Sequence, residues 1–218
     1  RASCIVQLAL GNIGRSGGGA NIFRGHANVQ GATDVGPNPD SLPGYYGLAE
    51  GSWKFFASVW GVDFEWIKKQ YAPGMMTKSR MTVSRRFDGV LEKNKLPDQA
   101  SSPRGQLFWG HAPNSQTRGA EMVEAMKKLD TLVVIDPYPS ATAAMAAMVR
   151  KDGVYLLPAC TQFETHGSAT ASNRSLQWRE KVIEPLFESK PDHTIMYAFA
   201  RKFGWGEQLV KNIKLEKD

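Results

Sequence analysis

The sequence predicts an α/β protein built around a Rossmann-like layer of parallel βαβ units. Three short apolar runs, at 105–110, 131–136 and 154–159, alternate with two helix-forming segments between residues 104 and 160. Apolar runs of this length bounded by turn residues are typical of buried strands. Strand–helix–strand connections within one sheet are right-handed, so this order predicts a parallel sheet. A glycine-rich loop and a helical, aromatic insertion precede the predicted layer.

The composition excludes several classes of protein. The chain has 218 residues, enough for one or two domains, and its 42% hydrophobic and 22% charged content is that of a globular protein and not of a disordered or fibrous one. No uninterrupted apolar stretch approaches 18 residues, so we expect no direct membrane insertion. The 27 Lys and Arg are scattered among 21 Asp and Glu, and this pattern does not support a nucleic-acid partner.

The two cysteines, Cys4 and Cys160, are too few for a disulfide scaffold, a four-cysteine zinc site or an iron–sulfur cluster. As single thiols in apolar surroundings, both are expected in the core. His166 and His193 are isolated in the sequence, and we interpret them as structural or solvated side chains.

Residues 1–50 are rich in glycine. RASCIVQLALGNIG resembles the tail of an apolar helix without its start, and the chain stops at KNIKLEKD, so we expect a piece of a longer protein. The segment that follows has no sustained periodicity. Ile22, Phe23 and Val29 are spaced as anchors between the glycines, which favours an ordered loop over a flexible linker.

The next segment, WKFFASVWGVDFEWIKKQY, predicts an aromatic-rich helical region. Phe55, Phe56, Val59 and Trp60 have the i, i+1, i+4, i+5 spacing of an amphipathic face, which we interpret as packing against a core and not as a ligand platform. The loop DQASSPRG marks a boundary near residue 103.

Two helices are expected within the parallel layer, and another near the end of the chain. RGAEMVEAMKKL places four apolar residues on one helical face: Met122, Val123, Met126 and Leu129. PSATAAMAAMVR is alanine-rich, and Ser140 is suited to its N-cap. Residues 161–175 are expected as a polar loop, and HTIMYAFARKFG as a helix stopped by Gly204.

Candidate ligand-binding residues follow the predicted strands, because parallel α/β sheets bind ligands beyond the carboxyl ends of their strands. The first loop offers a close backbone approach and polar groups, at Gly110, His111, Asn114 and Ser115. Asp136 ends the second strand, where an acidic residue can bind a ribose or guanine donor; on spacing alone, a turn acid before Pro137 is equally possible. The third loop, TQFETHGSATASNR, should lie at the same edge. The phosphate-binding motifs GxGxxG and GxxxxGK[ST] are both missing, so these loops alone indicate a nucleotide-like ligand only weakly.

The glycine-rich loop GGGANIFRGHANVQGATDVG carries a second set of candidates. Its glycines let the backbone approach a ligand closely. The Arg24 guanidinium presents a planar fork suited to a small carboxylate, and His26 can act as an acid, base or hydrogen-bond donor near neutrality. The alternative is an ordinary surface arginine and loop histidine.

This loop, followed by LPGY, resembles the catalytic subunit of the molybdenum- or tungsten-dependent formate dehydrogenases, in the molybdopterin oxidoreductase superfamily. The later runs FWGHAPNSQ, VVIDPYPSATA, LLPA and ETHGSATASNRSLQWR are similar to that family in order and spacing. The resemblance extends from residue 8 to about residue 185. The RGHxNVQGxTD stretch is specific to formate dehydrogenases, whereas the βαβ runs indicate only the superfamily.

The resemblance implies roles for particular residues. Arg24 matches the arginine that orients formate, and Gly25 and His26 fall beside it near the pterin. The positions implied for the guanine dinucleotide and pterin are Gly110, His111, Asn114, Ser115, Ile135, Asp136, Pro137, Thr165, Asn173 and Arg174. The implied cofactor is a bis-molybdopterin guanine dinucleotide with Mo or W. No metal ligand is expected in this chain, because the Cys or selenocysteine ligand and a [4Fe-4S] cluster belong to upstream sequence.

The resemblance also implies an organisation and an activity. We expect residues 1–50 to end one cofactor domain and to carry the substrate loop, 51–103 to connect, 104–190 to bind the guanine dinucleotide, and 191–218 to form a helical tail. The expected activity is oxidation of formate to CO2, with the fragment inactive alone. Expected partners are formate, the rest of the subunit and an iron–sulfur electron-transfer subunit, in a bacterial cytoplasm or periplasm. The alternatives are a nitrate reductase-like enzyme and a non-catalytic nucleotide-binding or scaffold module.

Overall fold

Two compact units make up the chain in the computed structural model, which describes residues 2–20, 25–37, 41–70, 76, 85–93, 96, 99, 101–115, 117–171, 173–211 and 213. Unit 1 combines residues 1–47 with residues 168–177. Unit 2 contains residues 48–167 and 178–218. Within the described part of the chain, every helix is too short or too polar to cross a membrane.

The centre of unit 2 is the predicted parallel sheet. Its strands lie in the order β1 (Gly105–Trp109), β2 (Thr131–Asp136) and β3 (Tyr155–Pro158). Gly105 pairs with Thr131, and Val133 pairs with Tyr155, in a parallel register on both sides of β2. Helix α6 (Gly119–Lys128) connects β1 to β2, and α7 (Ala141–Val149) connects β2 to β3. The predicted strand–helix–strand–helix–strand order is therefore confirmed.

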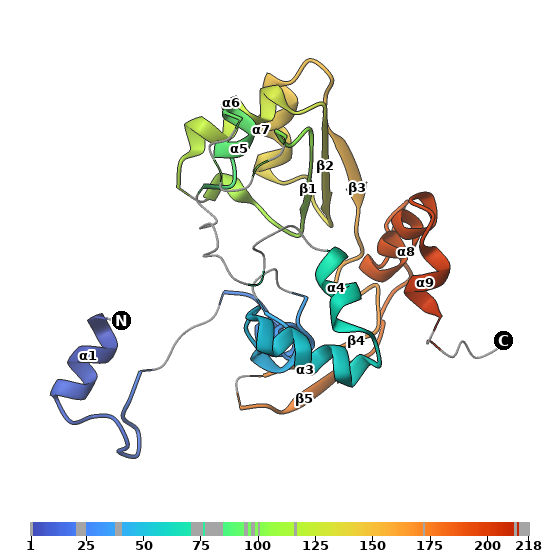
Figure 1. Ribbon diagram of the computed structural model, residues 1–218. Helices are drawn as coiled ribbons and strands as arrows, with labels where there is room; N and C mark the ends of the chain where they lie inside the picture. The colour runs from blue at the N-terminus through green and yellow to red at the C-terminus, as the bar shows by residue number, and fades with distance from the viewer. Residues whose placement is uncertain are drawn as a thin grey trace. The chain divides into compact units, whose positions relative to one another are not determined.

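The two faces of β2 enter separate hydrophobic clusters. Leu132 and Val134 join one cluster with residues of α5 (Asp88–Leu91), α6 and α7, which cover the same face of the sheet (Figure 1). Val133 and Ile135 point the other way and pack with residues of α8 (Asp192–Lys202). A strand buried on both faces needs apolar residues on both, which explains the continuous apolar run LVVI at the centre of β2.

The helices on the first face pack as their sequence patterns predict. Met122, Met126 and Leu129 are buried, and Val123 packs against them. The Ser140 Oγ accepts a hydrogen bond of 3.3 Å from the Ala143 N–H, so the predicted N-cap is confirmed.

A buried arginine connects both helices to the sheet. Arg150, which follows α7, is only 9% exposed. Its guanidinium donates to the carbonyl oxygens of Leu129 at 2.7 Å, Gly153 at 2.7 Å and Asp130 at 3.2 Å, and also to that of Met126. Carbonyls at a helix C-terminus have no partner within the helix. Arg150 therefore caps the end of α6 while fixing the turn that leads into β3.

A buried carboxylate fixes α5 to the start of α6. Asp88 accepts a hydrogen bond from Arg85 Nε at 3.0 Å and pairs with Arg118 Nη1 at 2.7 Å. The hydrogen bonds from Arg85 and then Arg118 lower the pKa of Asp88. The carboxylate therefore stays ionised and keeps both cations in place.

The aromatic segment forms α3 (Glu50–Trp60) and α4 (Phe64–Gln70), but its buried face differs from the prediction. Trp53, Phe56 and Ala57 are buried, at i, i+3 and i+4. Phe55, Val59 and Trp60 are between 48% and 59% exposed. The expectation that these three residues pack against a core was wrong, because the helix turns the face containing Trp53 inward.

The segment expected as a polar loop contains a strand pair. Strands β4 (Gly167–Thr170) and β5 (Leu176–Arg179) form a two-stranded antiparallel sheet. Helix α8 begins at Asp192 and is followed by Gly204, whose φ of +84° explains the glycine at the predicted stop. A short helix, α9 (Gly206–Val210), comes next.

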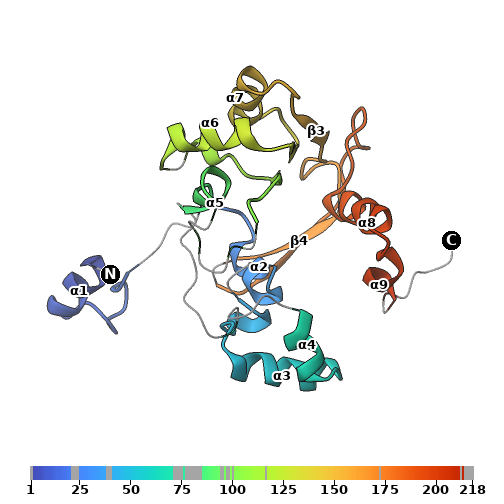
Figure 2. The ribbon, with the colours of Figure 1, turned by 45° about the horizontal axis from the view of Figure 1, so that its top comes forward.

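Among the described residues of unit 1 there are three helical segments, of which α1 (Ala2–Ala9) matches the expected apolar helix. Cys4 on α1 is exposed, so its predicted core position was wrong; Cys160 in unit 2 is buried as predicted. Helix α2 (Val29–Val35) and the short η1 (Pro43–Tyr45) interrupt the expected loop. Figure 2 shows α2 beside β4.

Candidate functional site

Three loops of unit 2 begin at the carboxyl edge of the parallel sheet. The Gly110 N–H donates to the Ile135 carbonyl at 2.8 Å, and the Ala159 N–H donates to the Asp136 carbonyl at 3.2 Å. These bonds align the ends of all three strands. The prediction that the loops following the strands start at one edge is confirmed.

The first loop holds its amide side chain by a contact from α7. Thr142, which has no exposed surface, donates from Oγ1 to Asn114 Oδ1 at 2.8 Å and accepts from the Asn114 N–H at 3.2 Å. This pair fixes the carboxamide, so that its NH2 group points away from Thr142. A fixed donor at the sheet edge suits a polar ligand.

Gly110 leaves space for a close approach at this edge. Its φ is +55°, and a Cβ built on it would meet nothing within 4 Å. His111 is half-buried, with its ring 6.4 Å from that of Phe108. Ser115 is exposed and its hydroxyl donates to the Ala112 carbonyl at 2.9 Å.

Asp136 stabilises a turn with one carboxylate oxygen and has a second oxygen that can accept from a ligand. Its Oδ1 accepts from the Tyr138 N–H at 3.1 Å, as expected for a turn acid, and the residue is half-buried. This bond uses one carboxylate oxygen and is compatible with a ligand on the other. Ile135 is fully buried and its carbonyl accepts from Gly110, while Pro137 is exposed.

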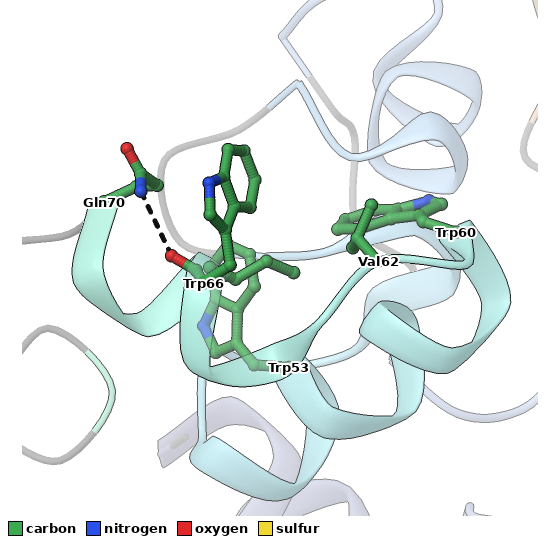
Figure 3. A pocket seen from close by; sticks show the side chains of 6 residues that line it. Trp53, Trp60, Val62, Trp66 and Gln70 are labelled. Carbon is green, nitrogen blue, oxygen red and sulfur yellow. Dashed lines mark hydrogen bonds between the residues drawn. The ribbon is translucent and has the colours of Figure 1, made fainter.

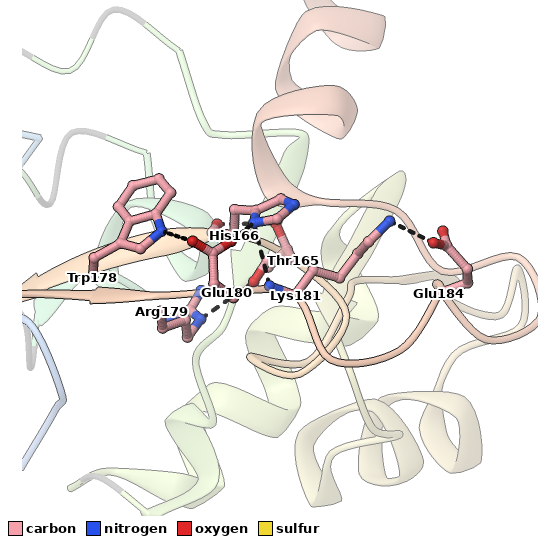
Figure 4. A network of polar contacts seen from close by, with 7 residues as sticks. All are labelled: Thr165, His166, Trp178, Arg179, Glu180, Lys181 and Glu184. Atoms are coloured by element: carbon pink, nitrogen blue, oxygen red, sulfur yellow. Dashed lines mark hydrogen bonds and ion pairs between the residues drawn. The ribbon is translucent and has the colours of Figure 1, made fainter.

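The third loop leads to a polar network at the base of the β4–β5 pair (Figure 4). His166 Nδ1 lies 2.8 Å from Glu180 Oε2, and Trp178 Nε1 donates to the other oxygen of Glu180 at 2.6 Å. The Thr165 carbonyl accepts from Arg179 Nε at 3.4 Å. The partner of His166 lies 14 positions later in the sequence, and the exposed, hydrogen-bonded ring agrees with the expected structural or solvated side chain. The side chains of His166 and Glu180 are both more than half exposed, so their contact contributes little to stability.

Glu164 anchors the same loop from inside. It is 3% exposed, and its carboxylate accepts from the backbone N–H groups of Leu186 at 2.5 Å and Thr161 at 2.6 Å, and from the Ser189 hydroxyl at 3.1 Å. These hydrogen bonds, that of Leu186 foremost, lower the pKa of Glu164 to about 2. Hydrogen bonding to the charged form outweighs the burial that disfavours it.

Glu164 should make unit 2 less stable as the pH falls below about 4.5. Its pKa is about 2 in the fold against 4.5 unperturbed, so its contribution is complete above pH 4.5 and is lost as the pH falls towards 2. We expect Glu164→Gln to lower the thermal midpoint at pH 7, and the difference from wild type to shrink steadily between pH 4.5 and pH 2. Differential scanning calorimetry checks this. Glu184→Gln, at a carboxylate 80% exposed, is the control; an equal difference at pH 7 and pH 2.5 contradicts the assignment.

The RGHxNVQGxTD stretch, residues 24–34, is called the RGH motif below. In unit 1, its described residues contact the end of β4 and the turn between β4 and β5. Arg24 lies outside the described residues, and Gly25 and His26 are exposed. Further along the motif, Asn28 Oδ1 accepts from the Thr170 N–H at 2.9 Å, and Asp34 Oδ1 lies 3.5 Å from Arg174 Nη1.

The turn itself holds the two remaining candidates. Asn173 is exposed, and its Oδ1 accepts from the Ser175 N–H at 3.1 Å and from the Ser175 hydroxyl at 2.7 Å. Arg174 has a φ of +65°, and its guanidinium lies 5.8 Å from the centre of the Tyr45 ring. The motif and the Asn173–Arg174 pair, far apart in sequence, are therefore neighbours.

A separate hollow of about 260 Å³ lies on α3 and α4 (Figure 3). Its lining is apolar apart from Gln70, whose Nε2 donates to the Trp66 carbonyl at 3.2 Å. The residues that line it are Trp53, Trp60, Val62, Trp66, Ile67 and Gln70. None of the predicted site residues belongs to this hollow.

Sequence reasoning did not find the residues that support the site. Thr142 gives no signal within an alanine-rich helix, and the partners of Asn28 and Asp34 lie about 140 positions away. Gly31, three residues after Asn28, is a local signal of this contact, because a glycine inside a helix indicates that another group approaches its backbone closely. Within the described residues, no three His, Cys, Asp or Glu side chains gather as a possible metal site.

The chain has an α/β fold in which three loops start at one edge of a parallel sheet, the edge at which such sheets commonly bind ligands. A family model, molybdopterin oxidoreductase, matches residues 2–202, and the chain belongs to this family. The superfamily resemblance is thereby confirmed, and the family implies a molybdopterin cofactor.

Curated relatives agree with this family. The chain is 30% identical to the F420-dependent formate dehydrogenase subunit alpha of Methanocaldococcus jannaschii, over 97% of this chain and 28% of that protein. It is 30% identical to the formate dehydrogenase subunit alpha of Megalodesulfovibrio gigas, over 93% of this chain and 23% of that protein. A Bacillus subtilis protein named "probable oxidoreductase YjgC" is 35% identical over 92% of this chain and 18% of its own length. The chain thus spans between 18% and 28% of the length of these relatives.

Proposed function

We propose that this chain is a segment of the catalytic subunit of a formate dehydrogenase, which oxidises formate to CO2. The observation that carries the proposal is the similarity to two proteins named formate dehydrogenase subunit alpha over more than nine-tenths of the chain. The RGH motif supports it, because a guanidinium and an imidazole two residues apart suit a small carboxylate substrate.

The sheet edge of unit 2 fits one guanine dinucleotide arm of the cofactor. Gly110 leaves open space at a positive φ, Asn114 presents a fixed amide donor, and the Asp136 carboxylate has an oxygen beyond the one used in its turn. A carboxylate matches the paired N–H donors of guanine. His111 and Ser115 would add side-chain groups, and Ile135 and Pro137 would place the backbone.

The pterin contacts are assigned to the remaining candidates. Thr165, in unit 2, would make a pterin–guanine contact. In unit 1, Asn173, Arg174 and Gly25 would contribute to cofactor binding. A bis-molybdopterin guanine dinucleotide with Mo or W would, when bound, supply the two-electron redox chemistry. The protein supplies position and electrostatic field.

This chain's own residues would orient the substrate. Arg24 would bind the formate carboxylate through two parallel N–H···O bonds, which fixes the direction of the C–H bond. His26 would hold or move a proton beside it. The rest of the subunit would supply the metal ligand and a [4Fe-4S] cluster, and an iron–sulfur subunit would accept the electrons.

The full-length protein that contains this chain tests the proposal directly. We expect it to purify with Mo or W and guanine-containing pterin, and to reduce a viologen dye with formate. Nitrate reduction without formate oxidation would instead identify a sister enzyme. Absence of metal and pterin after expression in a cofactor-producing host would favour a nucleotide-binding or scaffold module.

Replacement of Asp136 should release the guanine arm. We expect Asp136→Ala to lower the guanine dinucleotide content by roughly tenfold under limiting cofactor, since a buried polar partner left unpaired costs about 1–3 kcal/mol. Asp136→Asn keeps the turn acceptor for Tyr138 and removes the charge. The two variants therefore separate the turn from cofactor binding. Wild-type metal and pterin content in both would refute the guanine assignment.

A further inference from the structure

One side chain of the RGH motif bonds to a distant strand instead of to its own helix. Asn28 directly precedes α2, and an asparagine at this position commonly caps its own helix. The α2 helix has no side-chain cap hydrogen bond. The Asn28 Oδ1 instead accepts from the Thr170 N–H at 2.9 Å, across 142 positions of sequence.

The local backbone is shaped for this contact. Asn28 has φ +60° and ψ +20°, a left-handed conformation that asparagine tolerates better than most residues. A Cβ on Gly31 would lie 2.2 Å from Asn28 Oδ1 and 3.0 Å from Thr170 Oγ1. Only glycine at position 31 leaves space for the Asn28 carboxamide. The contact with Thr170 therefore explains both the asparagine at position 28 and the glycine at position 31.

The other links from α2 attach further from the candidate catalytic residues. Gln30 is 5% exposed and its amide donates to the Tyr45 hydroxyl. Asp34 pairs with Arg174 at 3.5 Å, but Arg174 is 65% exposed, and such pairs hold weakly. Asn28 comes only two residues after His26. Its hydrogen bond to Thr170 of β4 therefore fixes the backbone just after His26.

We propose that Asn28 is a positioning residue for this site. Its carboxamide, in the space that Gly31 leaves, holds the end of the loop, residues 25–27, beside β4, so that His26 meets the substrate in one geometry. This role rests on the proposed function of the RGH loop. In it, Asn28 acts through the loop and touches neither substrate nor cofactor.

Four variants of the full-length holoenzyme test the role. Asn28→Asp keeps an acceptor oxygen and tolerates the left-handed conformation. Asn28→Gly keeps the conformation and removes the acceptor, and Gly31→Ala fills the space beside it. The double variant Asn28→Gly with Gly31→Ala has no carboxamide to displace. Gly51→Ala in α3 is the matched control, because a Cβ there meets nothing within 4 Å.

Each variant is measured for cofactor content, for formate kcat and KM, and for hydrogen–deuterium exchange at the Thr170 amide and across residues 25–31. We expect Asn28→Gly and Gly31→Ala to speed Thr170 exchange by roughly tenfold, the loss of one hydrogen bond. Their kcat should fall by on the order of tenfold to a hundredfold at wild-type cofactor content, as misplaced reacting groups do. Asn28→Asp should keep both the Thr170 exchange rate and kcat near their wild-type values. In the double variant, neither the exchange rate nor kcat should differ further from wild type than in Asn28→Gly alone.

Two results would overturn the role. Unchanged exchange at Thr170 and at residues 25–31 in Asn28→Gly would show that the carboxamide does not hold the loop. Faster exchange with full turnover would show that the contact is structural only. If the wild-type protein does not oxidise formate, the proposed function fails, while the exchange of residues 25–31 still decides whether Asn28 holds the loop.

Discussion

Replacement of Arg24 should abolish efficient formate oxidation while leaving the cofactor bound. Formate has three heavy atoms and one charge, so its orientation must come from directed hydrogen bonds more than from surface contact. Arg24→Lys keeps the charge but loses the planar fork, and at a bidentate site this exchange is not conservative. We expect kcat/KM of the lysine variant to fall by on the order of a hundredfold. The alanine variant should fall further, with a raised KM.

Steady-state oxidation of formate by the full-length enzyme, normalised to bound metal, is the measurement. Arg15→Ala is the control, because Arg15 is an exposed arginine in the same glycine-rich region. A rate for Arg24→Ala within about threefold of wild type, far short of the tenfold that 1.4 kcal/mol gives, would make Arg24 a surface residue. The substrate assignment would then fall with it.

Replacement of Arg150 should be the most destabilising single change in the parallel layer. Four carbonyl oxygens, at the end of α6, the start of β2 and the turn before β3, accept from its guanidinium. Arg150→Met fills a similar volume and donates nothing. We expect it to lower the free energy of unfolding of unit 2 by about 3 kcal/mol, since each buried carbonyl left without a donor costs about 1–3 kcal/mol and some will find water.

Urea unfolding of this chain, followed by tryptophan fluorescence, measures the change, because all six tryptophans lie in unit 2. Arg104→Met is the matched control: Arg104 also lies beside Asp130, but its side chain is 84% exposed, and its loss should cost less than about 0.5 kcal/mol. Arg150→Lys can reach only part of the carbonyl set and should fall between. Equal midpoints for Arg150→Met and Arg104→Met would show that the guanidinium is not holding these elements together.

The parallel layer could be predicted because its information is local. The four central residues of β2, Leu132–Ile135, are all apolar, since both faces of the strand are covered, and Met122, Met126 and Leu129 follow one helical period. Ser140 caps α7 through a residue three positions later. These signals need only neighbours in sequence, and all of them are confirmed.

The elements that were missed depend on distant partners. LQWR alternates apolar and polar residues, but all four residues of β5 are exposed, so this short run has no buried face that would set it apart from a loop. Helix α2 contains Gly31 and begins after a left-handed Asn28, and both features make sense only beside Thr170. On α3, the aromatic run offers several possible inward faces, and the sequence alone does not choose Trp53 over Trp60. For the site, residue types and loop positions were predictable, whereas the contacts that fix them, from Thr142 to Asn114 and from Asn28 to Thr170, were not.

The division of unit 1 into two stretches of sequence has a consequence for synthesis. Residues 1–47 leave the ribosome well before residues 168–177, which complete the same unit. At about 15 residues per second, the 142 positions between Asn28 and Thr170 take on the order of ten seconds to translate. During that interval the nascent RGH motif lacks its anchor strand, while β1, α6 and β2, whose contacts are closer in sequence, can already begin to pair and pack. The RGH motif is thus made early and assembled late, after the parallel layer has been translated.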